Sequence, residues 1–280
     1  TRSARSQRRT LRALVYILVI IGAVVSMVPF YWTIISSGKT IQEIYRYPPT
    51  FWPEHPQFMV NYLEIWAAYP FGRWFINSFY VTFMALLGTI ISATVVAYGF
   101  ARFRFPGRET LFLLVLGTMM LPWQVTIVPT FLLFKQFKMI NTYWPLVLPA
   151  FFGSPYFIFM LRQFFRTIPV ELSDAAYIDG ANEFQIMLKV ILPLAKPALT
   201  VVALLQFMNA WNDYLGPLIY LFDDRKYTLS LGLAMFRTQY GAEWGQMMAV
   251  STVVTIPLII LFFFTQRTFI QGIAMSGLKG

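Results

Sequence analysis

The stretch PVELSDAAYIDGANEFQIMLKVILP, residues 169–193, is the most informative segment of the chain. Pro169 stands where a helix can begin, and acidic residues follow in the first turns, where the helix dipole favours negative charge. Gly180 tolerates backbone conformations that other residues resist, which suits a sharp turn. The second predicted helix carries an apolar face made of Phe184, Ile186, Met187 and Val190. We therefore predict two short helices joined at Gly180 and closed by Pro193.

Small residues in this segment allow two interpretations. Ala175, Ala176 and Ala181 have side chains short enough for another surface to approach the backbone closely. In one interpretation the segment is an amphipathic helix that lies on the inner surface of a membrane. In the other it is a docking element for a cytoplasmic protein.

Six long stretches of almost uncharged sequence surround the segment, four before it and two after it. They are residues 13–38, 74–101, 110–134, 139–161, 197–222 and 244–266. Because a helix needs roughly 20 mainly apolar residues to cross a bilayer, each stretch can form one span. Only Asp213 places a charge within them. The pattern predicts an all-α polytopic membrane protein with six transmembrane helices.

Composition excludes several classes of protein. The chain has 280 residues, of which 58% are hydrophobic and 12% are charged, whereas soluble domains have about 25% charged residues. A disordered protein, a nucleic-acid module and an ordinary cytosolic enzyme are therefore excluded. With no cysteine and one histidine, no metal site is expected.

Charge distribution predicts the topology. Of the 22 Lys and Arg residues, 14 fall on the N-terminal arm and the other segments that would face inward, and 8 on outer loops. Basic residues are enriched in cytoplasmic loops, so both termini are expected in the cytoplasm. The net charge of +10 is then a topology signal, and no nucleic-acid partner is expected. The first apolar run is too long for a signal peptide and is interpreted as a retained helix.

Motif spacing in the quoted segment resembles a known loop. The pattern D-A-A-x-x-x-G, nine residues and then V-x-L-P, from Asp174 to Pro193, resembles the EAA loop of binding-protein-dependent ABC transporter permeases. Asp174 stands where glutamate is usual and Val190 where isoleucine is usual. The flanking stretches INTYWPLVLPA (140–150), LRQFFRTIP (161–169), AWNDYLGPLI (210–219) and FIQGIAMSGLKG (269–280) are similar to MalG-like permeases of the carbohydrate-uptake branch. The resemblance covers about residues 73–280.

The resemblance implies the type I ABC importer permease fold, with cytoplasmic coupling helices between helices 4 and 5. In this family the coupling helix docks on an ATPase subunit, which holds the ATP and Mg that the permease itself lacks. Carried over by position, the coupling residues are Glu171, Asp174, Ala175, Ala176, Asp179, Gly180, Ala181 and Pro193. The implied partners are a second homologous permease, two ATP-binding subunits, an extracytoplasmic solute-binding protein and the lipid bilayer. The implied location is a bacterial or archaeal cell membrane.

Polar residues within the spans are candidates for a substrate path. They are Gln124 in the third stretch and Gln206, Asn209, Asn212 and Asp213 in the fifth. The last four recur at three- and four-residue spacing, so they share a helix face. Either they line a hydrated path or they make hydrogen bonds between helices. In the last outer loop, Phe236, Arg237 and Tyr240 are candidates, by position alone, for contact with the binding protein; the alternative is an ordinary solvated loop.

The sequence also indicates a division into an N-terminal arm, first helix and outer loop (1–72), a permease core (73–267) and a cytoplasmic tail (268–280). Ser37-Gly38-Lys39-Thr40 imitates the end of a phosphate-binding loop, but Thr33 stands where the first glycine is required. No catalytic residue is therefore expected. The alternatives are a membrane-embedded lipid-linked sugar transferase, which needs a cluster of acids or histidines, and an ion-coupled carrier, which predicts inverted repeats.

Topology can be tested directly because the chain has no cysteine. A cysteine at Gly107 is expected to react with a membrane-impermeant thiol reagent only from the cytoplasmic side. A cysteine at Asp224 is expected to react only from outside. Labelling of both positions from one side would contradict the six-span topology.

Overall fold

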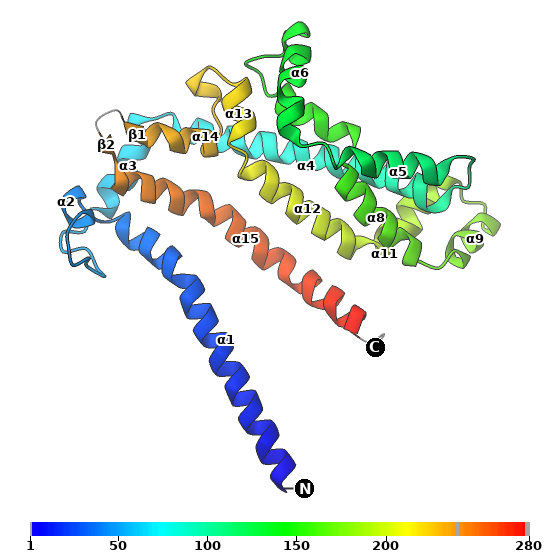
Figure 1. The fold of residues 1–280 in the computed structure, drawn as a ribbon, viewed down its shortest axis with the longest axis horizontal. Coiled ribbons are helices and arrows are strands. Elements are labelled where there is room, and N and C mark those ends of the chain that lie inside the picture. Colours follow the sequence, from blue (N-terminus) through cyan, green and yellow to red (C-terminus); the bar gives the residue numbers. More distant parts are fainter. Residues whose placement is uncertain (1, 239–240, 278–280) are drawn as a thin grey trace. The chain divides into compact units, whose positions relative to one another are not determined.

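The computed structural model describes residues 2–238 and 241–277 and is helical almost throughout (Figure 1). The longer helices are α1 (Arg2–Ser36), α3 (Phe58–Ala68), α4 (Phe71–Arg102), α5 (Arg108–Thr118), α6 (Trp123–Gln136), α8 (Pro155–Thr167), α9 (Glu171–Ile178), α12 (Lys196–Trp211) and α15 (Trp244–Gly277). The shorter ones are α2 (Ile41–Ile44), α7 (Trp144–Val147), α10 (Glu183–Ile186), α11 (Leu192–Leu194), α13 (Leu215–Tyr220) and α14 (Leu229–Leu233). Two short strands, β1 (Arg237–Thr238) and β2 (Gly241–Ala242), pair antiparallel.

Six candidate membrane spans are present within the described residues if each bent helix pair counts as one. Four are continuous: Leu11–Ser36, Phe71–Arg102, Trp144–Thr167 and Trp244–Gln266. The other two are broken, α5 with α6 at 93° and the segment Glu183–Leu194 with α12 at 81°. The sequence predicted six spans, and Pro122 and Pro129 predict a kink in the third, where the structure has one. The second bend was not predicted, and it lies between Leu194 and Lys196, just before the predicted stretch 197–222. Pro122 lies at the first break and caps α6, as its lack of a backbone N–H and its fixed φ favour.

The chain forms two compact units. One unit contains residues 1–69 and 233–256, and the other contains residues 70–232 and 257–280. The sequence placed residues 233–256 in the permease core, whereas the structure groups them with the N-terminal segment.

Small side chains let helices pack closely around α4 in the second unit. Ala93 and Ala97 of α4 are fully buried, and they belong to one apolar cluster with Leu161 of α8 and Val202 of α12. A side chain at Gly88 would collide with the ring of Phe151. Small residues at such interfaces allow helix backbones to approach in a membrane.

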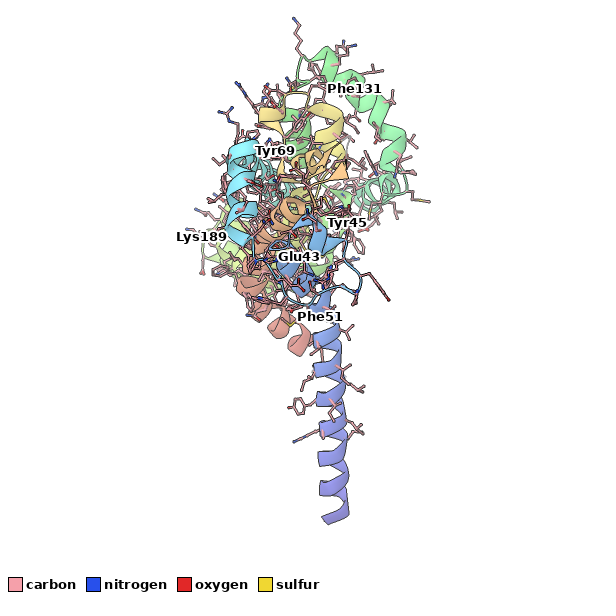
Figure 2. All side chains as sticks on the ribbon, turned by 90° about the vertical axis from the view of Figure 1, so that its left-hand side faces the viewer. Glu43, Tyr45, Phe51, Tyr69, Phe131 and Lys189 are labelled. Atoms are coloured by element: carbon pink, nitrogen blue, oxygen red, sulfur yellow. The ribbon has the colours of Figure 1, made fainter. Side chains whose placement is uncertain are left out.

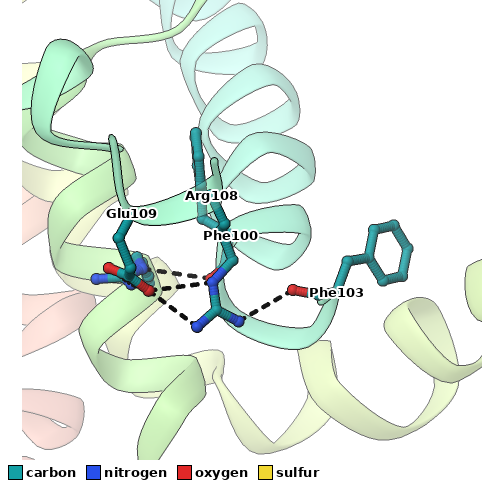
Figure 3. Close-up of polar contacts among 5 residues, drawn as sticks. Phe100, Phe103, Arg108 and Glu109 are labelled. Carbon is teal, nitrogen blue, oxygen red and sulfur yellow. Dashed lines mark hydrogen bonds and ion pairs between the residues drawn. The ribbon is translucent and has the colours of Figure 1, made fainter. Parts of the chain in front are cut away.

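An ion pair fixes the end of α4 that leads into α5 (Figure 3). Arg162 of α8 is 3% exposed, and its Nη2 donates to both carboxylate oxygens of Glu109 at 2.8 Å. The same guanidinium donates from Nε to the carbonyl of Phe100 at 3.3 Å and lies over the Phe112 ring at 3.9 Å. Glu109 also accepts a bond from Arg108 at 2.8 Å. Arginine suits this position because its several N–H donors can bind the Glu109 carboxylate and the Phe100 carbonyl at the same time.

The loop that follows α1 in the first unit is organised around a buried lysine. Lys39 is 2% exposed, its Nζ donates to the carbonyl of Thr50 at 2.5 Å, and it lies 4.3 Å from the Trp32 ring centroid. Burial lowers the pKa of Lys39, and the nearby Glu43 carboxylate opposes that shift. Glu43 accepts the backbone N–H of His55 at 2.9 Å. Lys39 thus has a structural role, which agrees with the sequence interpretation that its phosphate-loop motif is accidental.

Aromatic residues of the same loop remain at the surface. Tyr45 and Phe51 are 67% and 74% exposed, and Glu43, from the same loop, is buried (Figure 2). The Tyr45 hydroxyl accepts a bond from Trp244 Nε1 at 2.6 Å, which ties the loop to the start of α15 within this unit.

The two partners of the ion pair are expected to differ in their effect on stability. Glu109→Leu leaves a buried cation without its carboxylate, whereas Arg162→Met leaves an exposed carboxylate that still has Arg108 beside it. Removing the partner of a buried charge is the costlier change. The melting temperature measured in detergent should therefore fall by several degrees for Glu109→Leu and by less for Arg162→Met. The reverse order would contradict this role of the pair.

Candidate functional site

Helix α9 presents an uncovered apolar surface next to the predicted motif residues. Leu172, Tyr177 and Ile178 are 42%, 46% and 88% exposed, although all three are large and apolar. Asp174 and Ala175 are exposed as well, and Ala176 is half-buried. Glu171 and Asp174 lie in the first turn, where the sequence placed them. The helix is therefore available on its outer side for contact with another surface.

A glycine turn separates α9 from α10, as predicted. Gly180 has φ of +83°, and a side chain there would meet nothing within 4 Å. Only its backbone conformation, which costs other residues roughly 1–2 kcal/mol, demands glycine. Asn182 then caps α10 through a reciprocal pair of bonds with Gln185, at 2.9 and 3.0 Å. Asp179 ends α9, and the backbone N–H of Ala181 donates to the Ala176 carbonyl at 2.9 Å.

The second half of the segment is anchored in the core. Ile186 and Ile191 are fully buried, Met187 is 6% exposed, and all three belong to the cluster around α4 and α8. Met187–Ile191 form a π-helix, and Pro193 is exposed at the bend before α12. Of the predicted apolar face, Ile186 and Met187 are buried and Val190 packs against the cluster, whereas Phe184 is 64% exposed. Ile191 was not part of the prediction.

Two cavities in the second unit meet at Asp213. One has a volume of about 360 Å³ and is lined in part by Gln206, Asn209 and Asp213. The other, of about 790 Å³, is lined in part by Trp123, Thr126, Asn212, Asp213 and Tyr214. The structure thus brings together four of the five path residues predicted from sequence. Gln124 does not line either cavity.

Asp213 lies outside the helix in which the sequence placed it. Helix α12 ends at Trp211, and Asp213 Oδ1 accepts the backbone N–H of Gly216 at 3.0 Å, which caps the start of α13. A side chain at Gly216 would collide with the Asp213 carboxylate and come within 3.0 Å of Leu146. Asp213 therefore has a local structural bond besides its position at the cavities.

Of the three candidate residues for contact with a binding protein, the structure describes the side chain of Phe236 alone. Phe236 is fully buried, and its ring centroid lies 4.4 Å from that of Tyr69 in the first unit. Its ring packs inside this unit and is not at the surface, contrary to what a direct contact requires. The side chain of Arg237 and the whole of Tyr240 lie outside the described residues.

Comparison with known proteins decides the family. Residues 85–275 match the family described as the binding-protein-dependent transport system inner membrane component. The chain belongs to this family. It is a multi-pass membrane permease, and the motif resemblance at residues 169–193 is placed within the matched region. Neither the family nor the relatives below support the sugar transferase alternative.

Relatives extend the match along the permease. The arabinooligosaccharides transport system permease protein AraQ of Halalkalibacterium halodurans is 38% identical over 210 residues, which are 75% of each chain. The sn-glycerol-3-phosphate transport system permease protein UgpE of Yersinia pestis is 32% identical over 277 residues, 96% of this chain and 98% of its own.

A solved structure matches the fold. A chain from the crystal structure of a bacterial ABC transporter that imports the acidic polysaccharide alginate superposes with a TM-score of 0.81. The two chains are 22% identical, and the match covers 92% of this permease and 96% of that chain. The fold predicted from the motif, that of an ABC importer permease, is confirmed.

Sequence reasoning missed several residues of the cavities and of the coupling segment's anchors. Trp123, Thr126 and Tyr214 line the larger cavity, and Tyr98 and Arg102 of α4 bind the segment that carries α9. Pro122 beside Trp123 was the available signal for the first group. Arg102, the first charge after a long apolar stretch, was the signal for the second.

Asp213→Asn is expected to keep the fold of the permease and to change transport. Asparagine retains an oxygen that can accept the Gly216 N–H, but it places a donor where the cavities now meet a carboxylate. Complex yield should stay normal while uptake falls or substrate preference shifts. Asp213→Leu also removes the cap, at a cost of about 1 kcal/mol, so its melting temperature should fall as well.

Asp223→Asn is the matched control for this pair. Asp223 Oδ1 caps the backbone N–H of Arg225 at 3.0 Å, and Asp223 lines neither cavity. This control should leave uptake unchanged. Wild-type uptake by Asp213→Asn, measured with complex yield in the same preparation, would argue against a role for Asp213 in the substrate path.

Proposed function

We propose that this permease moves a sugar, oligosaccharide or polyol derivative inward and that residues 169–193 couple it to an ATPase subunit. The observation that carries the coupling role is the contrast within the segment. Its first helix, α9, exposes apolar and acidic residues, whereas its second half is buried against α4 and α8. A helix exposed on one side and tied to the spans on the other is suited to transmit movement from a bound partner.

The motif residues have distinct parts in this proposal. Asp174, with Glu171 and Asp179 beside it, offers negative charge to the partner, and the exposed Ala175 lets the partner surface approach. Ala176 and Ala181 are half-buried and pack against the apolar core cluster, so their small side chains serve the seating of α9 on the permease itself. Gly180 sets the direction of α9, and Pro193 ends the segment before the bend into α12. Tyr177 and Ile178 add apolar area to the same exposed helix.

The substrate class is supported by the relatives, whose names concern arabinooligosaccharides and sn-glycerol 3-phosphate. The cavities at Asp213 combine aromatic, hydroxyl, amide and carboxylate groups, which suit ligands rich in hydroxyl groups. Gln124, which lines neither cavity, has the weakest support among the path residues.

The proposed assembly contains a second homologous permease, two ATP-binding subunits and a solute-binding protein outside the membrane. ATP and Mg belong to the ATP-binding subunits, because this chain offers no phosphate-binding loop at Lys39. Both termini are placed in the cytoplasm of a bacterial or archaeal cell, on the basis of the basic residues of the N-terminal arm. Arg237 and Tyr240 stay candidates for contact with the binding protein by sequence position alone.

The experiment compares Gly180→Val with Gly107→Val in the tagged chain expressed with its partner subunits. Both glycines have positive φ, +83° and +79°, and both have open space where a side chain would go. The two variants therefore carry the same backbone penalty, roughly 1–2 kcal/mol. Both should insert and melt at similarly lowered temperatures, but only Gly180→Val should lose most of the co-purifying ATPase and of uptake.

Two outcomes would contradict the coupling role. Normal recovery of the ATPase with Gly180→Val would mean that α9 is not the docking surface. Equal losses with Gly107→Val would mean that the effect comes from general destabilisation.

A further inference from the structure

Helix α4 holds the coupling segment at two points that lie one helical turn apart. Tyr98 and Arg102 are four residues apart near the end of α4, so both side chains lie on the same helix face. One binds the segment that precedes α9 in the chain, and the other binds the segment that follows it. Arg102 binds the stretch that enters α9, and Tyr98 binds the residue that begins α10.

The first point is a pair of bonds to the end of α8. Arg102 Nη2 donates to the carbonyls of Phe165 and Ile168, both at 3.0 Å. These carbonyls lie just before Pro169, and a basic side chain there satisfies acceptors that a helix end leaves open. Arg102 also interacts electrostatically with Asp174 of α9. The entry to α9 is thereby fixed to α4.

The second point is a short bond to a carboxylate. The Tyr98 hydroxyl donates to Glu183 Oε2 at 2.6 Å, and Tyr98 is 4% exposed. Hydrogen bonds with an ionised acceptor are short and about twice as strong as neutral ones. Glu183 is the first residue of α10, three positions after the Gly180 turn.

The bond adds a constraint that the apolar core cannot supply. Ile186 and Met187 bury apolar area in the cluster that includes Ala97, and such contacts oppose separation but are non-directional. A hydrogen bond weakens steeply when its distance or angle changes. The bond between Tyr98 and Glu183 therefore adds to the resistance that the packing offers against sliding of α10 along α4.

We propose that Tyr98 and Glu183 are positioning residues that fix the register between the coupling segment and α4, so that a displacement of α9 moves α4 with it. This inference rests on the proposed coupling role of residues 169–193. Arg102 holds the entry to α9 and Tyr98 holds the exit. If the bonds at either end of α9 are lost, α9 moves along α4 without moving α4.

The test uses the complete complex in membrane vesicles and needs no substrate. Thr126 lines the larger cavity, and Thr126→Cys supplies the only thiol in this chain. Its labelling rate by a membrane-impermeant maleimide is measured without nucleotide and after trapping with Mg-ATP and vanadate. The ratio of the two rates measures how strongly the nucleotide state of the ATPase changes the accessibility of the cavity.

Tyr98→Phe removes one oxygen and keeps the ring, so it should leave the amount of ATPase bound and its basal hydrolysis unchanged. The change in labelling rate on trapping should fall to less than half of that of the parent. Glu183→Leu should have a similar effect, although it keeps the longer contact of 3.5 Å between the Tyr98 hydroxyl and the Glu183 carbonyl. The double variant should be no worse than Tyr98→Phe alone, since Tyr98→Phe already removes both bonds. Glu183→Gln keeps an acceptor oxygen and should retain most of the change.

Tyr156→Phe, at an exposed tyrosine of α8 (47% exposed), is the matched control and should behave as the parent. A full labelling change in Tyr98→Phe would overturn the proposal, as would additive losses in the double variant. Loss of bound ATPase in Tyr98→Phe would also overturn it, because the pair would then serve folding or assembly. If the parent itself binds no ATPase, the proposed coupling role fails, which is a separate result.

Discussion

Close approach of helix backbones along α4 governs the arrangement of the second unit. Ala93 and Ala97 present almost no side chain, so α8 and α12 can both pack against the same helix, and Phe151 can occupy the space over Gly88. In a membrane this packing has no hydrophobic driving force of its own and depends on van der Waals contact between small residues. The end of α4 can then carry the bonds of Tyr98 and Arg102 because its position is already fixed.

Two of the spans are broken, and their irregular backbone needs hydrogen-bond partners. The chain turns by 93° between α5 and α6 and by 81° before α12, and a helix interrupted inside a membrane leaves backbone groups that need partners. A further irregular stretch follows the end of α12, and there the Asp213 carboxylate accepts the Gly216 N–H. Irregular backbone, a polar side chain and a cavity thus occur at one place, as expected where non-helical backbone lines a hydrated space.

Features set by nearby residues could be predicted from the sequence, and features set by distant ones could not. The six apolar stretches and the Gly180 turn depend on local spacing, and the structure has six candidate spans among the described residues and a positive φ at Gly180. The motif from Asp174 to Pro193 also depends on local spacing, and its coupling role stays a prediction. Trp123 and Asp213 line one cavity, and this depends on how closely two spans that are distant in the sequence approach each other in space. The burial of Phe236 was missed for the same reason, since its partner Tyr69 lies far away in the sequence.

Helix α9 contacts the rest of the permease on one side only, through the buried Ser173 and through Ala176, which packs against the core cluster. Its outward residues, such as Leu172 and Ile178, are exposed and belong to no part of the apolar core cluster. Substitutions on this face therefore leave the stability of the spans untouched, and selection can act on them separately. The sequence of this face can therefore change while the packing among α4, α8 and α12 stays the same.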